Sequence, residues 1–366
     1  MDLDALRAAL EAVDGEILDA WARRDAITAA IGRLKQSVGQ AIHDPAQEAR
    51  VVERARTQAA ARGIPEDLAA ELVGLLMHSA LARQEDIRLR AEGQGAGRPA
   101  LVVGGGGNMG RWFCRFLTAQ GYEVRVADPA GGPPDVPAAA DWRETPDEFA
   151  LTVVAAPLHI SAGILEGIAA ERRQGLIFDI GSVKAPLAPG LRALAESGCR
   201  VASVHPMFGP DTHVLHGCHV LVMDVGHPEA AAEAAGVFGG TMAEILRMPL
   251  PEHDPLIAYV LGLSHALNLA FLTALQESGE QAPRLARLSS VTFDRQLRVS
   301  AAVARENPHL YYEIQQRNPH GPAAIHSLAA AVSRLAAVIH DDDEEAFVRL
   351  MQAGRRYVSG RGQAIG

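Results

Sequence analysis

A glycine-rich turn between an apolar run and a helical pattern constrains this chain more than any other feature. Gly105, Gly107 and Gly110 follow the apolar run 101–103 and open a helical stretch. In a strand–turn–helix unit, such glycines allow a tight turn, close approach of a pyrophosphate, and close packing of the helix on the strand. Asp128 ends the next apolar run, where its carboxylate can accept hydrogen bonds from a ribose 2′-hydroxyl. The pattern predicts an NAD site rather than an NADP site, made of Gly105, Gly107, Asn108, Met109, Gly110 and Asp128.

Apolar runs alternate with helical patterns across residues 99–250. The runs are LVV, EVRVA, LTVVAAP, GLIFDIGS, CRVASV and CHVLVMDV. Alternation of this kind predicts a mostly parallel sheet with helices on both faces. Helical patterns alone fill residues 1–90 and 251–366, and the glycine-rich stretch 91–98 suits a linker. We therefore expect an α/β fold with all-α flanks: a helical domain, a linker, a Rossmann-type domain and a second helical domain.

The N-terminal 90 residues carry apolar side chains at helical spacing. No proline falls before Pro45, and Asp44-Pro45 resembles a helix N-cap followed by a proline in the first turn. The sequence Gly-Ile-Pro at 63–65 marks a second break. One long helix and two shorter ones are too small a unit to bury all their apolar faces. We therefore expect this domain to form a homodimer.

Charge, cysteine content and hydropathy limit the class of partner. The formal net charge is −10, whereas binding to nucleic acid needs a basic surface. Three scattered cysteines are too few for a disulfide framework, which favours a reducing compartment. No run approaches the roughly 18 apolar residues of a membrane span, and the acidic N-terminus has no apolar signal core. We expect a cytoplasmic protein that acts on small molecules and binds neither nucleic acid nor membrane.

Two further segments place polar side chains directly after apolar runs, where α/β sheets hold their chemistry. DIGSVK supplies Ser182 and Lys184, and SVHPMFGP supplies His205. A histidine there can accept a proton near neutral pH, which the removal of hydride from a hydroxyl-bearing carbon requires. The proline, phenylalanine and glycine that follow His205 build a rigid turn, which favours a placed base over a packing residue. Lys184 is interpreted as structural or as a residue at the edge of the site.

The segments LVVGGGGNMGR, DIGSVK and HPMFGPD, in this order and spacing, closely resemble the prephenate dehydrogenases, particularly those fused to a chorismate mutase. The likeness covers nearly the whole chain. It implies that His205 binds the ring hydroxyl of prephenate and accepts its proton while hydride passes to NAD, and that Ser182 helps to hold the hydroxyl. Loss of CO2 then gives 4-hydroxyphenylpyruvate. The resemblance also places His265 near the substrate side chain, with helix packing as the alternative interpretation.

One position departs from the family pattern. The family has an arginine that grips the substrate carboxylate six residues before the proline of a D-P or N-P turn. Six residues before Pro308, this chain has Ala302. Arg298 and Arg305 lie about one helical turn to either side, so either can substitute. The alternative is an altered substrate, for which the candidate is 4-amino-4-deoxyprephenate.

Chorismate rearrangement needs fixed cations to fold a dianion and to stabilise charge on the ether oxygen. Arg24 and Lys35 are 11 residues apart and share one helix face. Arg7 lies about 42 Å from Lys35 along one helix, so a single small ligand cannot contact both in one chain. If all three bind chorismate, Arg7 must reach the site of a partner subunit.

This arrangement is that of the all-helical chorismate mutases, which the segment resembles through LR, RRDAI, GRLK and DPAQE. By position, the resemblance implies a site made of Arg7, Arg24, Lys35, Glu48 and Gln84. Asp44 is a possible contact to the substrate hydroxyl. Gln47 stands where the family usually has arginine, and Ala80 stands where a serine is common.

Other interpretations of the sequence remain open. The N-terminal helices can be a non-catalytic dimerisation or regulatory module on a monofunctional dehydrogenase. A generic 3-hydroxyacid dehydrogenase explains neither HPMFGP nor those helices. Metal binding is not predicted, because alternate side chains of a strand point to opposite faces and do not bring together His213, His216, Cys218 and His219.

Overall fold

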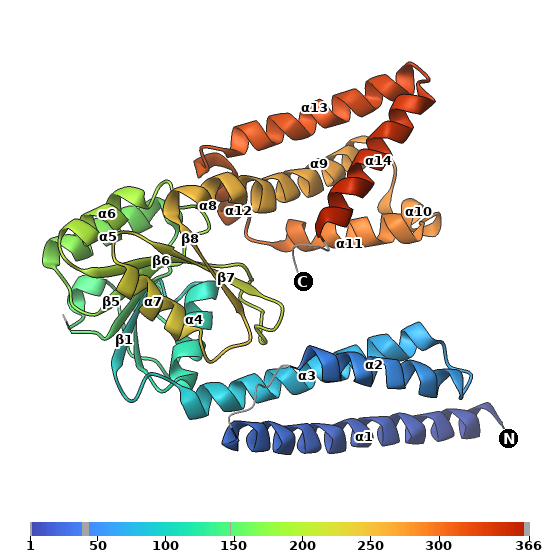
Figure 1. Ribbon diagram of the computed structural model, residues 1–366, viewed down its shortest axis with the longest axis horizontal. Coiled ribbons are helices and arrows are strands. Elements are labelled where there is room, and N and C mark those ends of the chain that lie inside the picture. Colours follow the sequence, from blue (N-terminus) through green and yellow to red (C-terminus); the bar gives the residue numbers. More distant parts are fainter. Residues whose placement is uncertain (1, 39–43, 147, 362–366) are drawn as a thin grey trace. The chain divides into compact units, whose positions relative to one another are not determined.

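The chain folds as two compact units. One comprises Met1–Ser182 with Leu187–Leu250, and the other comprises Val183–Pro186 with Pro251–Gly366. The structure, a computed structural model, describes residues 2–38, 44–146 and 148–361. Figure 1 shows the order of the helices and strands. The predicted class, α/β with all-α flanks, is confirmed.

An eight-stranded sheet forms the centre of the first unit, with the strand order β3-β2-β1-β4-β5-β6-β7-β8. Its neighbouring strands are parallel except at β6 and β7, which are antiparallel. The chain order reverses between β1 and β4, which is where sheets of this kind bind ligands beyond the carboxyl ends of their strands. The strands are β1 Pro99–Val103, β2 Glu123–Ala127, β3 Ala138–Ala139, β4 Leu151–Val154, β5 Leu176–Asp179, β6 Arg200–Pro206, β7 His219–Asp224 and β8 Glu244–Pro249.

Helices cover both faces of this sheet (Figure 1). On one face α4 and α7 pack together, because Phe238 stacks on Phe116 and contacts the fully buried ring of Phe113 edge-on. Each buried aromatic side chain of this kind contributes about 1.5–3 kcal/mol. On the other face α5 packs against α6. These helices are α4 Asn108–Ala119, α5 Leu158–Glu171, α6 Ala188–Glu196 and α7 Pro228–Val237.

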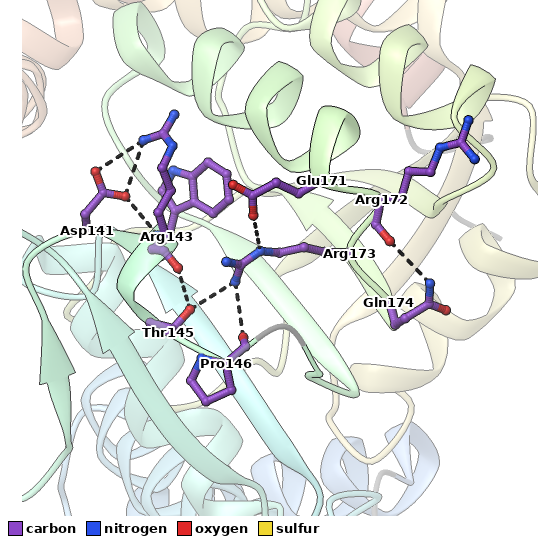
Figure 2. Close-up of polar contacts among 9 residues, drawn as sticks. Asp141, Arg143, Thr145, Pro146, Glu171, Arg172, Arg173 and Gln174 are labelled. Atoms are coloured by element: carbon purple, nitrogen blue, oxygen red, sulfur yellow. Dashed lines mark hydrogen bonds and ion pairs between the residues drawn. The ribbon is translucent and has the colours of Figure 1, made fainter.

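An arginine cluster secures the edge at which the parallel strands begin (Figure 2). The Trp142 ring lies between two guanidinium groups, 4.4 Å from that of Arg143 and 4.7 Å from that of Arg173. Arg173, only 4% exposed, also donates to Thr145 Oγ1 and to the carbonyl of Pro146. These contacts tie the segment before β4 to the end of α5. The cluster is therefore structural, and it lies at the opposite edge from the carboxyl ends of the strands.

Among the described residues, three helices precede the sheet, as the apolar spacing predicted. Asp44 caps the second of them by accepting from Gln47 N at 2.9 Å, with Pro45 in the first turn, so the predicted N-cap is confirmed. The apolar side chains of the first helix are largely exposed in the single chain, for example Leu3 at 61% and Leu10 at 62%. The helices are α1 Leu3–Ser37, α2 Pro45–Ala60 and α3 Glu66–Glu92.

The second unit is helical in the part of the chain that the structure describes. A π-helical segment, Ala258–Leu263, interrupts its first long helix. Two stretches, Leu250–Glu277 and Gly321–His340, are long and apolar enough to cross a membrane by length and composition alone, although the sequence had no unbroken apolar run of that length. The helices are α8 Leu250–Ile257, α9 Ser264–Glu277, α10 Ala282–Arg287, α11 Val291–Arg305, α12 Pro308–Arg317, α13 Gly321–His340 and α14 Glu344–Arg361.

Candidate functional site: a dinucleotide loop, two strand ends and a helical anion site

The glycine-rich loop joins β1 to α4. At two of the glycines predicted from the sequence, a side chain would not fit. A Cβ on Gly105 would lie 2.5 Å from the Val126 side chain, and one on Gly110 would lie 2.1 Å from the Gly104 carbonyl. The left-handed residue of the turn is Gly104, with φ +88°, and not Gly105. A Cβ on Gly107 would meet only the Gly104 carbonyl, at 3.4 Å. The loop therefore packs tightly against the sheet and stays open at Gly107, where a pyrophosphate would approach.

Asp128 lies beside this loop, at the end of β2. Its carboxylate accepts from Gly106 N at 3.0 Å and from Ala130 N at 2.8 Å. Gly107 N donates to the Gly104 carbonyl at 3.1 Å, and among the described residues no side chain caps α4, so the N–H groups of its first residues, Asn108 and Met109, have no side-chain acceptor. A helix N-terminus with free N–H groups binds phosphate, and an adjacent carboxylate suits ribose hydroxyls. The residues present fit a dinucleotide such as NAD.

The carboxyl ends of β5 and β6 hold the predicted catalytic residues on neighbouring strands. Asp179, fully buried at the end of β5, accepts from Ser203 Oγ on β6 at 2.6 Å and from Gly181 N at 2.8 Å. Ser182 follows directly and is half-buried. His205 lies two residues after Ser203 and is 3% exposed. Asp179 thus fixes the turn that carries Ser182 relative to the strand that carries His205.

The connection after His205 is anchored from two helices of the first unit. Trp112 Nε1 of α4 donates to Thr212 O at 2.8 Å. Glu85 of α3 accepts from Leu215 N at 2.8 Å and from Met242 N at 2.6 Å. Burial raises the pKa of the Glu85 carboxyl, and the two N–H donors oppose that effect. In the part of the chain that is described, no three His, Cys, Asp or Glu side chains converge as metal ligands.

A buried aspartate in the second unit clamps the segment that follows Ser182. Asp254 accepts from Lys184 N at 2.8 Å, from Ala185 N at 2.7 Å, and lies 2.7 Å from His253 Nδ1. Burial favours a higher pKa for Asp254, but its hydrogen bonds from His253, Lys184 and Ala185 outweigh burial and lower that pKa. Lys184 is 1% exposed. Sequence reasoning missed Asp254 and its neighbour His253, since the backbone partners of Asp254 lie about 70 residues earlier.

The predicted substrate residues of the second unit lie on different helices. His265, 8% exposed at the start of α9, stacks on Tyr311 of α12 with ring centroids 4.1 Å apart. Burial lowers the pKa of His265, which keeps its ring neutral at physiological pH. Arg298 and Arg305 are exposed on α11. Ala302 lies between them and is exposed as well.

The N-terminal helices bring part of the predicted anion site together. Arg24 of α1 donates to Leu76 O of α3 at 2.7 Å, and Gln84 of α3 donates to Thr28 O of α1 at 3.0 Å. Lys35, Glu48 and Asp44 are half-buried. Arg7 is exposed, pairs with Asp4 at 3.3 Å, and lies on the same continuous helix as Lys35. Arg7 therefore cannot join the Lys35 site of its own chain.

Gln47, which replaces the arginine of the family pattern, holds a guanidinium on the next turn of α2. Its Oε1 accepts from Arg50 Nε at 3.0 Å and from Nη2 at 2.8 Å. Arg50 was not predicted, although residues three apart on a helix are neighbours and the pair was readable from the sequence. The second substituted position, Ala80, is buried in α3.

A parallel sheet with a glycine-rich loop, an acid at the end of β2 and a buried histidine at a strand end defines a Rossmann-type dehydrogenase. Two family models match the flanking helical regions: "Chorismate mutase type II" over residues 6–85 and "Prephenate dehydrogenase, dimerization domain" over residues 250–353. The chain is 31% identical to a 4-amino-4-deoxyprephenate dehydrogenase of Streptomyces pristinaespiralis over 68% of this chain and 88% of that protein. It belongs to the prephenate dehydrogenase family and carries a type II chorismate mutase domain.

Other similar proteins cover more of the chain or have solved structures. A T-protein of Enterobacter agglomerans is 27% identical over 95% of this chain and 90% of its own length. The structure of prephenate dehydrogenase from A. aeolicus in complex with hydroxyphenyl propionate and NAD+ has a TM-score of 0.58 at 17% identity, and covers 72% of this chain and 98% of that chain. That likeness shows a shared fold.

Proposed function

We propose that this chain is a bifunctional enzyme that converts chorismate to prephenate and oxidises prephenate to 4-hydroxyphenylpyruvate with NAD. The observation that carries the proposal is the joint presence, on one chain, of the mutase-type helices and the dehydrogenase site at β1, β2, β5 and β6. The likeness to T-protein along 95% of the chain supports the same combination. We keep the division into 1–90, 91–98, 99–250 and 251–366 as the proposed domain boundaries.

His205 is the proposed general base of the dehydrogenase half. It takes up the proton of the ring hydroxyl as the carbonyl forms, and Ser182 holds that hydroxyl. When bound, NAD accepts the hydride from the same ring carbon. The ring carboxylate leaves as CO2, and its bonding electrons complete the aromatic ring. Burial of His205 keeps bulk water away from this proton transfer.

In the mutase half, the proposed residues act by binding and fixed charge alone. Arg24 and Lys35 hold the dianion with Glu48 and Gln84, and Asp44 meets the substrate hydroxyl. Arg50, positioned by Gln47, restores a positive charge near the substituted arginine. Arg7 acts in the site of the second subunit, because its own helix carries it away from Lys35. The working form is therefore a homodimer, proposed to be cytoplasmic and to bind neither nucleic acid nor membrane.

A second candidate keeps both reactions and changes the substrates to the 4-amino analogues. It is favoured by the 31% identity to a 4-amino-4-deoxyprephenate dehydrogenase, whereas Ala302 does not by itself indicate an amine, because the analogue keeps both carboxylates of prephenate. If prephenate is the substrate instead, Arg298 or Arg305 binds its carboxylate in place of the arginine that the family has at position 302. Gln47 favours the third candidate, a non-catalytic N-terminal module, whereas the retained Arg7, Arg24 and Lys35 oppose it.

The His205 proposal is tested with the variant His205→Asn. Loss of a general base lowers kcat for NAD reduction by about 100- to 10,000-fold, while the dissociation constant of NAD changes little. Stopped-flow NADH formation gives the first quantity, and fluorescence titration with NAD gives the second. His309→Asn, an exposed histidine on α12, is the control. Equal losses of rate and NAD affinity would count against the assigned role.

A further inference from the structure

A polar cluster in the second unit joins α12 to the π-helical segment Ala258–Leu263. Gln315 Nε2 of α12 donates to Gly262 O at 2.8 Å. One turn earlier on α12, Tyr311 stacks on His265, which lies three residues after Gly262. Residues three or four apart are neighbours on a helix. The Gln315–Gly262 hydrogen bond and the Tyr311–His265 stack therefore lie next to each other in one helix–helix interface.

Two polar atoms of this cluster are buried without a hydrogen-bond partner among the described residues: Gln315 Oε1 and His265 Nδ1. A buried polar atom without a hydrogen-bond partner destabilises the folded protein. Tyr311 and Gln315 are half-buried and His265 is 8% exposed, so the cluster lies just beneath the surface of its unit. Two polar atoms without partners on adjacent helical turns indicate a binding site, in which a ligand would supply the missing hydrogen bonds.

The hydrogen-bond pattern determines which chemical group fits. A carbonyl only accepts, so the bond to Gly262 O requires the amide nitrogen of Gln315 on that side and leaves Oε1 as an acceptor. Burial keeps His265 neutral, and a neutral imidazole offers one donor and one acceptor nitrogen. A carboxylate or phosphate cannot donate to Gln315 Oε1. A primary amine can donate to Gln315 Oε1 and to an acceptor nitrogen of His265 at once.

The interrupted helix gives a physical reason for the position of this cluster. A π-helical turn shifts the backbone register, and here the Gly262 carbonyl accepts from a side chain of α12. Such turns occur frequently at functional sites. The segment thereby fixes the rotamer of Gln315 and aims its oxygen, which a flexible surface glutamine would not do.

We propose that Gln315 is a specificity residue that, together with His265, binds an amino group of the substrate. The proposal rests on the dehydrogenase function given above and, within that function, favours an amine substrate over prephenate. Two prephenate derivatives carry such a group: 4-amino-4-deoxyprephenate has it on the ring, and arogenate has it on the side chain. Both present the same chemistry to Gln315, and the substrate comparison below distinguishes them.

The test measures kcat/KM for NAD reduction with prephenate, 4-amino-4-deoxyprephenate and arogenate, using the full-length protein. The variant is Gln315→Met, which keeps the length of the side chain and removes the acceptor. Gln316→Met, its exposed neighbour, is the matched control. We expect wild type to prefer one amine substrate over prephenate. In Gln315→Met, kcat/KM for that amine falls about 10- to 100-fold, mainly through KM, while prephenate changes less than about 3-fold.

The outcomes separate failure of this proposal from failure of the proposed function. A preferred ring amine assigns the subsite to the ring end of the substrate, and a preferred side-chain amine assigns it to the other end. Equal losses on all three substrates in Gln315→Met would show a structural role and overturn the proposal. So would a wild-type enzyme that prefers prephenate to both amines. If wild type oxidises none of the three with NAD, the proposed dehydrogenase function itself is wrong.

Discussion

Asp254 stabilises a segment of backbone that lies far from it in the sequence. Its carboxylate holds the backbone at Lys184 and Ala185, directly after Ser182. The glycines, Ser182 and His205 could be predicted because each follows an apolar run whose end defines its place. Asp254 and Gln315 could not, since what they do depends on contacts about 70 and 53 residues away. Polar residues in a helical pattern give no signal of such partners.

Replacing Asp254 by asparagine turns an amide N–H group toward a backbone donor and removes a buried charge. We expect Asp254→Asn to lower the free energy of unfolding by about 1–3 kcal/mol at pH 7. The folded pKa of Asp254 is lowered from its ordinary 3.8, so its stabilisation is complete above 3.8 and is lost as pH falls through the folded value. Urea unfolding at several pH values should therefore show the wild-type advantage shrinking below 3.8. Glu252→Gln, an exposed acid on the same helix, is the control, and an equal effect there would refute the account.

Among the helices and strands, the long periodic patterns could be predicted from the sequence, whereas the connections between them could not. The apolar spacing predicted α1, and the alternation of patterns predicted the sheet with helices on both faces. The antiparallel pairing of β6 with β7 was not foreseen, because the direction of a strand depends on how the connection after His205 folds back. The π-helical segment Ala258–Leu263 also escaped detection, since one shifted turn barely alters helical periodicity.

Helix α3 contributes an anchor for the connection that follows His205. Glu85→Ala leaves the N–H groups of Leu215 and Met242 without their acceptor, which costs about 1–3 kcal/mol for each buried group. We expect lower stability toward urea and faster hydrogen exchange at Leu215. Glu71→Ala, an exposed glutamate on the same helix, should leave both unchanged. Indistinguishable behaviour of the two variants would show that the anchor contributes nothing.

In the molecule as a whole, the first helix holds two of the proposed mutase residues far apart. Arg7 and Lys35 lie on one continuous helix, at a distance no small substrate spans. The exposed apolar side chains of α1, such as Leu10 at 62%, provide the surface that a second copy would cover. If Arg7 and Lys35 bind one substrate, the helix geometry already in the sequence requires two chains, whereas the residues that the partner contributes could not be predicted.

Mixing two inactive variants tests whether each mutase site contains Arg7 of one subunit and Lys35 of the other. Arg7→Ala and Lys35→Ala each abolish the mutase site in a homodimer. A refolded equal mixture contains mixed dimers in which one site carries both substitutions and the other carries neither. Chorismate turnover should return to about a quarter of wild type. A mixture as inactive as its components would place Arg7 outside the partner's site.

One chain is proposed to carry out two reactions in series. The most direct measurement is NADH formation by the purified protein supplied with NAD and with chorismate or 4-amino-4-deoxychorismate as its sole organic substrate. The account predicts NADH after a lag with at least one of them, and loss of that signal in Lys35→Ala unless the corresponding prephenate is added. A protein that oxidises a prephenate but forms no NADH from either chorismate would contradict it.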